Sequence, residues 1–505
     1  MAHGASLHFN QDPLDILEWD KFDYLVPEFG AAGAGAFLPD EADTAARLRA
    51  LAKTMVFDPG AQDPGSNMPA PYTYLGQFVD HDITQTTAVG ATSPDELIQK
   101  TEVRPLDRHE IRSLLRNRRT SGFDLDSLYG LQPPPDETEL AVPFTGDRFD
   151  LGTVVPVGNR PPNKDDHNDL PRVTDPKSPR FREARIGDPR NDENTIVAQL
   201  HLAFLKFHNA VVDDGFAFDD ARRLVTHHYQ WVILTDFLPR VCDPTVIRDV
   251  LQHGTRLYRP RGVEKFMPFE FAVAAYRFGH SLIRQTYDFN QNFRRVPGVG
   301  LQSVGSLELV FEFTKKSGDL DGHPTLAENW IIEWELMFAD RAMPIDPTLT
   351  PMLATLPKET DPMKFLAARN LLRGYLFALP TGQALAAAVL PAEKRLTLAE
   401  LQAACRAPDR PDEKGQWDVL KELELHERTP LWFYVLAEAK AKGNGNHLGP
   451  LGSLIVAETI VGLMQANPTS ILNVSFIPTL GPRPGQFDLQ DLLMKAGALS
   501  RRVAE

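Results

Sequence analysis

The chain has little cysteine and no long apolar run. Only two cysteines, Cys242 and Cys405, occur in 505 residues, which excludes a disulfide framework and a thiolate metal cluster. A membrane-spanning helix would need ~18 consecutive apolar residues, and none are present. The N-terminus lacks a basic region followed by an apolar segment. We therefore expect a soluble protein without a recognisable signal peptide, either cytoplasmic or exported by a non-Sec route.

An excess of basic charge is also missing. Lys and Arg total 53 against 68 Asp and Glu, which gives a net charge of −15. Nucleic acids and anionic membranes attract basic surfaces, so both are excluded as partners. The sequence contains no glycine-rich phosphate loop, internal repeat or heptad pattern. It gives no indication of the oligomeric state.

Apolar residues at helical spacing are present instead, and they dominate the chain from Asn194 onward. This periodicity predicts a mainly α-helical fold with little β structure. Alternating apolar residues make Leu307–Phe313 the best candidate for a strand. The helices are expected at residues 41–53, 73–83, 194–212, 219–240, 268–285, 325–338, 362–379, 397–405, 415–440 and 452–466.

Composition divides the chain into three parts. Residues 1–70 are rich in Pro, Gly, Ala and Asp and are predicted to form an N-terminal arm that packs on a larger body. That body would span residues 71–470, with a Pro-rich surface excursion at 131–189. Residues 471–505 would form a C-terminal extension.

Two acids flank a histidine on one predicted helix. Asp80, His81 and Asp82 are successive residues, and Gln77 lies one helical turn before His81. Burying two carboxylates beside an imidazole costs several kcal/mol unless each has a metal, a cation or a covalent partner. The alternative is an ordinary core histidine with solvated acids on either side. The rest of the chain favours a site.

Oxygen-bearing residues alternate in the segment from Thr120 to Asp126. In an extended loop, the Thr120 hydroxyl, the Gly122 carbonyl and the carboxylates of Asp124 and Asp126 can point at one centre, as Ca²⁺ requires. Asp82 is a candidate further ligand. The alternative is a solvated turn.

A third cluster of polar residues precedes the helix predicted from residue 194. Asp188, Asn191 and Asp192 would each favour a helix N-terminus, which is the plain structural explanation. Arg190 and Glu193, three residues apart, would project from neighbouring positions on a helix.

Two further segments carry polar groups on apolar helices. His280 follows Gly279, which leaves room for a flat group, although a lone histidine in such a setting is usually structural. Asn370 and Arg373 offer an amide and a cation one helical turn apart.

In order and in wording, these segments resemble the animal-type haem peroxidases of the peroxidase–cyclooxygenase superfamily. The resemblance covers residues 70–470, and the absence of disulfides is similar to the bacterial branch of that family. So are the stretches 379–383 and 429–432. The motifs that carry the resemblance are Gly76–Asp82, Thr120–Gly130, Gly187–Arg190, Phe207–Asn209, Arg277–His280 and Asn370–Gly374.

The resemblance implies a helical haem-peroxidase domain that reduces hydrogen peroxide through a ferryl intermediate. Small donors such as phenols, iodide, thiocyanate and bromide would be oxidised, and a role in the response to oxidative stress would follow. His81 would be the distal histidine that takes a proton from peroxide and returns it to the departing oxygen. Arg190 would stabilise charge on the breaking O–O bond, and Gln77 would hold the distal water or a halide.

The resemblance also implies how haem b is held. His280 would be the axial iron ligand, and Asn370 would accept the other ring N–H of that imidazole. Arg373 would pair with a haem propionate. Asp80 and Glu193 would form one or two ester bonds to haem methyl groups.

Calcium and the substrate range follow from the same family match. The family's calcium loop corresponds here to Asp82, Thr120, Gly122, Asp124 and Asp126. Asn194 stands where a family member carries a methionine linked to haem through a sulfonium bond. Without that bond we expect a less oxidising iron, which favours iodide, thiocyanate or phenols over chloride.

Two other functions are compatible with the same fold. A fatty-acid dioxygenase of the superfamily would need a tyrosine three residues before the axial histidine. Here that position is Arg277, and Tyr276 lies four residues before His280. A catalytically silent adhesion or binding protein would have lost the distal pair or the axial ligand, and this chain retains both.

Overall fold

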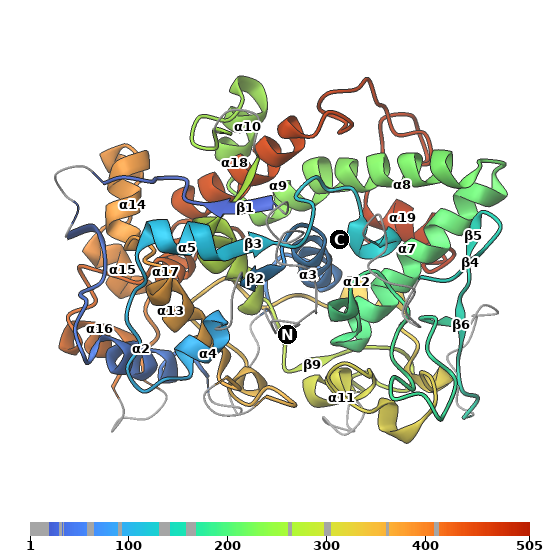
Figure 1. Cartoon of the computed structure of the whole chain (residues 1–505), viewed down its shortest axis with the longest axis horizontal. Helices are drawn as coiled ribbons and strands as arrows, with labels where there is room; N and C mark the ends of the chain where they lie inside the picture. The colour runs from blue at the N-terminus through green and yellow to red at the C-terminus, as the bar shows by residue number, and fades with distance from the viewer. Residues whose placement is uncertain are drawn as a thin grey trace.

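Helix α3 (Pro71–Ile83) lies at the centre of the molecule and is buried along most of its length (Figure 1). The structure is a computed structural model. It describes residues 20–29, 33, 35–57, 65–88, 93–130, 142–157, 168–260, 265–296, 305–359, 363–408 and 414–504. Among these residues, no helix is long and apolar enough to cross a membrane.

The structure is 48% helical with little strand, so the predicted fold class is confirmed. The longer helices are α2 (Thr44–Lys53), α7 (Thr195–Asp213), α8 (Phe218–Val232), α10 (Pro244–His253), α13 (Leu366–Leu376), α14 (Gly382–Val389), α17 (Leu431–Gly443) and α18 (Pro450–Ala466). The shorter ones are α4 (Pro94–Ile98), α5 (Arg108–Leu114), α6 (Asp126–Tyr129), α9 (Leu238–Val241), α11 (Leu307–Glu312), α12 (Trp334–Ala339), α15 (Leu398–Ala404), α16 (Gln416–Glu422) and α19 (Leu489–Lys495).

Strands are short and lie at the periphery of the helices. The largest sheet has the order β2–β3–β1–β8, in which β1 runs antiparallel to β3 and parallel to β8. Its strands are β1 (Asp20–Asp23), β2 (Thr86–Ala88), β3 (Leu115–Asn117) and β8 (Phe266–Pro268). The remaining strands form pairs: β4 (Phe144–Thr145) with β5 (Arg148–Phe149), β6 (Gly152–Thr153) with β7 (Asn168–Asp169), and β9 (Thr286–Tyr287) with β10 (Gly305–Ser306).

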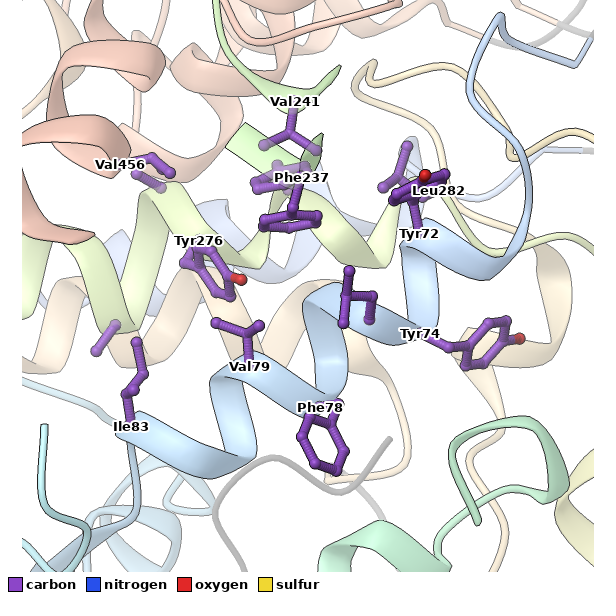
Figure 2. Close-up of a cluster of buried hydrophobic side chains, with 14 of the residues drawn as sticks. Tyr72, Tyr74, Phe78, Val79, Ile83, Phe237, Val241, Tyr276, Leu282 and Val456 are labelled. Atoms are coloured by element: carbon purple, nitrogen blue, oxygen red, sulfur yellow. The ribbon is translucent and has the colours of Figure 1, made fainter. Parts of the chain in front are cut away.

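The central helix is held by aromatic packing on one side. Phe78 of α3 stacks on Phe204 of α7, with ring centroids 4.5 Å apart and planes 3° from parallel. Tyr229 of α8 meets both rings edge-on. On the other side, Figure 2 shows Val79 pointing away from Phe78 and toward Tyr276. Side chains from three other helical segments therefore fix the rotation of α3 about its axis.

The segment predicted as one helix over 268–285 is irregular. It begins with a π-helical turn, η4 (Glu270–Ala274), and continues as a 3-10 helix, η5 (Ala275–His280). The break falls at Ala274, whose φ of −129° and ψ of −74° lie outside the helical region. π-helical turns frequently occur at functional sites, and this one precedes His280.

The strand predicted at Leu307–Phe313 is wrong. Residues 307–312 form helix α11, because the Ser306 hydroxyl accepts a hydrogen bond from the Leu309 amide and caps its start. Leu307, Val310 and Phe311 are buried, a spacing that suits one helix face. The apolar residues at 307, 309, 310, 311 and 313 fit a strand and a helix equally well.

Two other predicted helices are interrupted. The segment 415–440 divides into α16 and α17, with Pro430 at the N-cap of the second helix, where a missing N–H costs nothing. Residues 325–338 contain only the turn η8 (Glu328–Trp330) and the start of α12.

The domain bounds drawn from composition stay a prediction. From residues 1–70, α2 packs against α13 and β1 joins the largest sheet. From residues 471–505, α19 packs against α7. Residues 1–19 and the Pro-rich runs at 133–135 and 161–166 lie outside the described residues.

Candidate active site

The distal side of the site is built by α3 and the 3-10 helix η2 (Pro189–Asp192). His81 is fully buried, and its Nδ1 lies 2.8 Å from Oδ1 of Asn191. Arg190, from the same turn as Asn191, donates through Nη2 to the His81 carbonyl oxygen at 3.0 Å. The motifs around residues 81 and 190 therefore meet in space although 109 positions separate these two residues in sequence.

A buried carboxylate holds the distal arginine. Asp188 caps η2 by accepting from the Arg190 amide at 2.9 Å, and it also accepts from the Arg190 guanidinium at 2.6 Å. Arg119 pairs with the same carboxylate at 2.6 Å. Burial raises the pKa of Asp188, but the two guanidinium groups outweigh it and hold that pKa well below its usual range. Asp188 is therefore charged and fixes Arg190 beside His81.

Burial keeps the distal histidine neutral. The pKa of His81 is lowered to about 4, first by burial and then by the nearby Arg190 cation. A neutral imidazole has one nitrogen that can accept a proton. His81 can therefore act as a general base near neutral pH.

Gln77 and Glu193 extend the distal side. Asn194 caps α7 through its side-chain oxygen, and its amide nitrogen donates to Oε1 of Gln77 at 3.0 Å. Within the described structure, neither carboxylate oxygen of Glu193 has a hydrogen-bond partner, although the residue is fully buried. Burial raises the pKa of Glu193. Asp80, half-buried on α3, accepts from the Thr84 hydroxyl at 2.8 Å.

The proximal side is built by η5 and α13. His280 Nδ1 lies 2.8 Å from the amide nitrogen of Asn370, and Arg277 donates to the amide oxygen at 2.9 Å. The family resemblance predicted a contact between His280 and Asn370, with the amide oxygen facing the imidazole. Arg277 occupies that oxygen instead, so the Asn370 amide is turned with its NH₂ toward His280.

A cleft lies between α3 and η5. Gln77 and Asp80 of α3 line one wall, while Tyr276 and His280 of η5 line the other. A Cβ added to Gly279, which also lines the cleft, would meet no atom within 4 Å, so this glycine leaves open space. In Figure 2 the side chain of Tyr276 extends from its helix toward α3.

These features fit a haem. The cleft has an imidazole on one wall and an amide and a carboxylate on the other, as a macrocycle with one axial ligand and polar distal contacts would need. A buried carboxyl group without hydrogen bonds, such as that of Glu193, fits a covalent link better than a free charge. His81 and Arg190 do not line this cleft; His81 contacts Asn191, and Arg190 pairs with Asp188.

The predicted calcium ligands gather between α3 and the loop that leads into α6. The Thr120 hydroxyl lies 2.6 Å from Asp124 Oδ1 and 3.3 Å from Asp126 Oδ2. Asp82 accepts from the Ser127 hydroxyl at 3.1 Å. Burial raises the pKa of Asp82 well above its usual range, with Asp126 and Asp124 adding to the effect, and burial raises the pKa of Asp126 to about 7.

The other ligand predicted for calcium is engaged elsewhere. The Gly122 carbonyl accepts from the Asn467 amide at 2.7 Å. Among the described residues, no group of three or more His, Cys, Asp or Glu side chains is arranged to hold a metal ion. Calcium therefore stays a prediction.

Arg373 also has a protein partner. It lies on α13, as expected, and donates through Nη2 to the Asp95 carboxylate at the start of α4. The haem propionate predicted as its partner stays a prediction. Both cysteines, Cys242 and Cys405, are free.

Two residues of the site were not recognised in the sequence. The sequence indicates Asn191 only as a helix cap and does not single out His201, yet Asn191 contacts both His81 and His201. The actual cap of α7 is Asn194, and that of η2 is Asp188. Asn191 directly follows Arg190, and this adjacency was the only signal in the sequence that could have found it.

The family can now be stated. Residues 115–380 match the model of the animal haem peroxidase family. The chain therefore belongs to the animal haem peroxidase family, and membership implies a haem cofactor.

Individual relatives agree. The chain is 27% identical over 371 residues to a peroxidase-like protein of Margaritifera margaritifera, covering 61% of this chain and 44% of that one. It is 25% identical over 183 residues to a peroxidasin homologue of Caenorhabditis briggsae, covering 34% of this chain and 14% of that one. The chain thus spans less than half the length of these two relatives.

Solved structures share the fold. Peroxidase A from Dictyostelium discoideum superposes with a TM-score of 0.60 at 15% identity, covering 95% of this chain and 93% of that one. The fatty acid α-dioxygenase of Arabidopsis thaliana gives 0.54 at 15% identity, with 97% and 80% covered. The Oryza sativa fatty acid α-dioxygenase gives 0.53 at 14% identity, with 93% and 81% covered.

Proposed function

We propose that the chain is a haem peroxidase that reduces hydrogen peroxide and oxidises small donors such as phenols, iodide, thiocyanate and bromide. The observation that carries the proposal is the cleft between α3 and η5. His280 lines one wall, and the helix that bears His81 forms the other. A role in the response to peroxide stress belongs to the same proposal.

When bound, haem b supplies the redox chemistry at its iron. The proximal imidazole of His280 would hold the iron through Nε2, with its proton on Nδ1. The Asn370 amide would then present its oxygen to that proton and orient the ring. On the distal side, His81 accepts a proton from peroxide and returns it to the departing oxygen as water forms. Arg190 stabilises the negative charge that develops as the O–O bond breaks. Gln77 positions a distal water or halide.

Covalent and calcium links complete the proposal. Asp80 and Glu193 would each esterify a haem methyl group, since one lines the cleft and the other is a buried carboxyl group without hydrogen bonds. Calcium would be bound by Asp82 and by the 120–126 loop, and so would tie α3 to α6.

The experiment compares His81→Ala with a matched control, His208→Gln. His208 is also a buried histidine of the helical body, but its ring lies 3.1 Å from the Tyr129 hydroxyl, in another contact network. In stopped flow with haem-loaded protein, we expect His81→Ala to keep its Soret band and to react with peroxide about 10²- to 10⁴-fold more slowly, the usual contribution of a general base. His208→Gln should react at the wild-type rate.

A wild-type peroxide rate in His81→Ala would contradict the mechanism. Loss of rate in both variants, with loss of the Soret band, would indicate misfolding. In that case His81→Gln, which is closer in size to histidine, gives the decisive comparison.

A fatty-acid dioxygenase is the second candidate, and one observation favours it. Tyr276 lines the same cleft as His280, and within the described residues its buried hydroxyl has no hydrogen-bond partner. The irregular helix thus brings a tyrosine into the cleft although the sequence spacing is one residue too long. Oxygen uptake with a fatty acid, lost in Tyr276→Phe, would support this function. Guaiacol oxidation that persists in Tyr276→Phe would support the peroxidase.

A further inference from the structure

A chain of three buried polar side chains runs from the distal histidine into α7. His81 Nδ1 lies 2.8 Å from Oδ1 of Asn191, and the Asn191 amide nitrogen lies 3.0 Å from Nδ1 of His201. All three residues are 0% exposed. The chain therefore links three elements: α3, η2 and α7.

The chemistry of the amide sets the direction of both hydrogen bonds. An amide oxygen only accepts, so the proton between His81 and Asn191 sits on Nδ1 of His81. An amide nitrogen only donates, so Nδ1 of His201 accepts. A neutral His81 with its proton on Nδ1 has its lone pair on Nε2, and Nε2 is then the basic atom.

Asn191 is itself held from outside α3. Its backbone N–H donates to the Asp188 carbonyl at 3.0 Å, and the Asp188 side chain caps the same turn. His201 lies within α7, where Phe78 contacts its ring edge-on with centroids 5.9 Å apart. The amide is therefore placed by η2 and α7, and it can select one state of the His81 ring.

We propose that Asn191 and His201 are positioning residues that fix the distal histidine in the form whose base is Nε2. The inference rests on the proposed function. Without the Asn191 oxygen, the neutral ring of His81 loses the acceptor that holds its proton on Nδ1. Only the form with a proton on Nδ1 presents a base at Nε2.

The test compares two variants of haem-loaded protein, one without and one with an acceptor for His81. Asn191→Leu keeps the approximate volume and removes the acceptor. Asn191→Asp keeps an acceptor for His81, and its second oxygen faces His201, whose neutral ring can move its proton to Nδ1 and donate. If Asn191 acts only by filling space, both variants should behave alike.

Two readouts follow the positioning of His81. The rate of reaction with peroxide should fall about 10- to 100-fold in Asn191→Leu, the usual cost of losing a group that orients a functional histidine, and Asn191→Asp should recover most of it. Cyanide affinity, measured by titrating the Soret band with hydrogen cyanide, should weaken in the same order, because His81 must take the proton of the incoming acid. Haem content should stay unchanged.

Asn209→Ala is the matched control. Asn209 is also a buried amide, carried on α7, and it bonds the backbone of Phe149 at 2.8 and 2.9 Å. This variant should lower the melting temperature and leave cyanide affinity and the peroxide rate unchanged. If Asn191→Leu does not fold, His201→Leu replaces it. His201→Leu removes the acceptor for the Asn191 amide nitrogen, and both readouts should fall in it too.

The outcomes separate this inference from the proposed function. If Asn191→Leu binds cyanide and reacts with peroxide as the wild type does, while His81→Ala is slow, the positioning role is wrong and the peroxidase mechanism stands. Equal losses in Asn191→Leu and Asn191→Asp would also overturn the positioning role. A wild-type rate in His81→Ala would overturn the proposed function itself.

Discussion

Glu193 is the residue at which burial and charge conflict most strongly. It is fully buried, and within the described structure neither of its carboxylate oxygens has a hydrogen-bond partner. An ionised carboxylate in such a place is costly. Esterification to haem would remove the charge, and Asp80, which lines the cleft, is a second candidate for the same bond.

The ester links can be tested by extraction. After haem-loaded wild-type protein has reacted with peroxide, we expect its pigment to stay with the protein in acidic organic solvent. Asp80→Asn combined with Glu193→Gln should release all of the pigment, and each single variant should release part of it. Absorbance of the organic phase measures the released fraction.

Glu270→Gln is the control for that experiment. Glu270 is an equally buried glutamate, but it accepts hydrogen bonds from the Leu25 and Val26 amides and lies on the other side of the site. In the Glu270→Gln variant, the haem pigment should remain as firmly bound as in the wild type. Complete extraction of haem from the wild type would contradict the ester assignment.

At the scale of elements, α3 meets the 120–126 loop through three acids. Burial raises the pKa of Asp82, and repulsion from the nearby Asp126 and Asp124 adds to the rise. A bound cation would remove this repulsion. We expect EDTA to lower the melting temperature and added Ca²⁺ to restore it.

Asp82→Asn should abolish the calcium response in the same thermal melts. Asp20→Asn is the control, because Asp20 accepts from the Ser121 amide at 3.0 Å and so contacts the loop without being a candidate ligand. Its response to Ca²⁺ should match that of the wild type. Melting temperatures of the wild type that are indifferent to both EDTA and Ca²⁺ would argue against a calcium site.

Helices α17 and α18 are joined by a buried acid with a measurable pH signature. Glu438 accepts from the amides of Leu451 and Gly452, and burial raises its pKa from 4.5 to about 7. Because the pKa of Glu438 is raised, the folded state holds the proton of this carboxyl group more tightly than the unfolded state does. The difference matters at pH values from about 4.5 to 7. This group therefore lowers the free energy of unfolding as pH rises from about 4.5 to 7.

Glu438→Gln should remove that dependence and keep an acceptor for the α18 amides. Relative to wild type, the variant should gain stability as pH rises from 5 to 8, by on the order of 1 kcal/mol for each pKa unit of the shift. Urea unfolding at several pH values measures it. Parallel stability profiles for the two proteins would show that Glu438 does not titrate in this range.

The sequence predicted elements well where one apolar stripe continued without interruption. Helix α7 begins and ends within one residue of the predicted 194–212 segment. The prediction of one continuous helix over 268–285 is wrong because the backbone departs from helical geometry at Ala274. The strand predicted over 307–313 is wrong because its apolar residues fit either periodicity. The cap from Ser306 favours a helix.

The sequence predicted which residues form the candidate site better than it predicted their contacts. Motifs located His81, Arg190, His280 and Asn370 because short patterns carry them. Their partners come from elsewhere in the chain: Asn191 is 110 residues from His81, and Arg277 is 93 from Asn370. Local spacing contains no information on such pairs, so the turn of the Asn370 amide could not be anticipated.

At the scale of the whole molecule, both ends of the described chain brace the site. From the N-terminal part, α2 packs on α13, which carries Asn370, and β1 pairs with β8 just before η4. From the C-terminal part, α19 packs on α7, which carries His201. The proximal and distal sides are therefore held by segments far apart in sequence (Figure 1).

The central claim is that this protein holds a haem that reacts with peroxide. The most direct measurement is the absorption spectrum of haem-loaded protein before and after hydrogen peroxide, and again after guaiacol or iodide. The account predicts a Soret band that shifts with peroxide and returns when the donor is added. A Soret band indifferent to peroxide would contradict the peroxidase, and the absence of any Soret band would contradict haem binding itself.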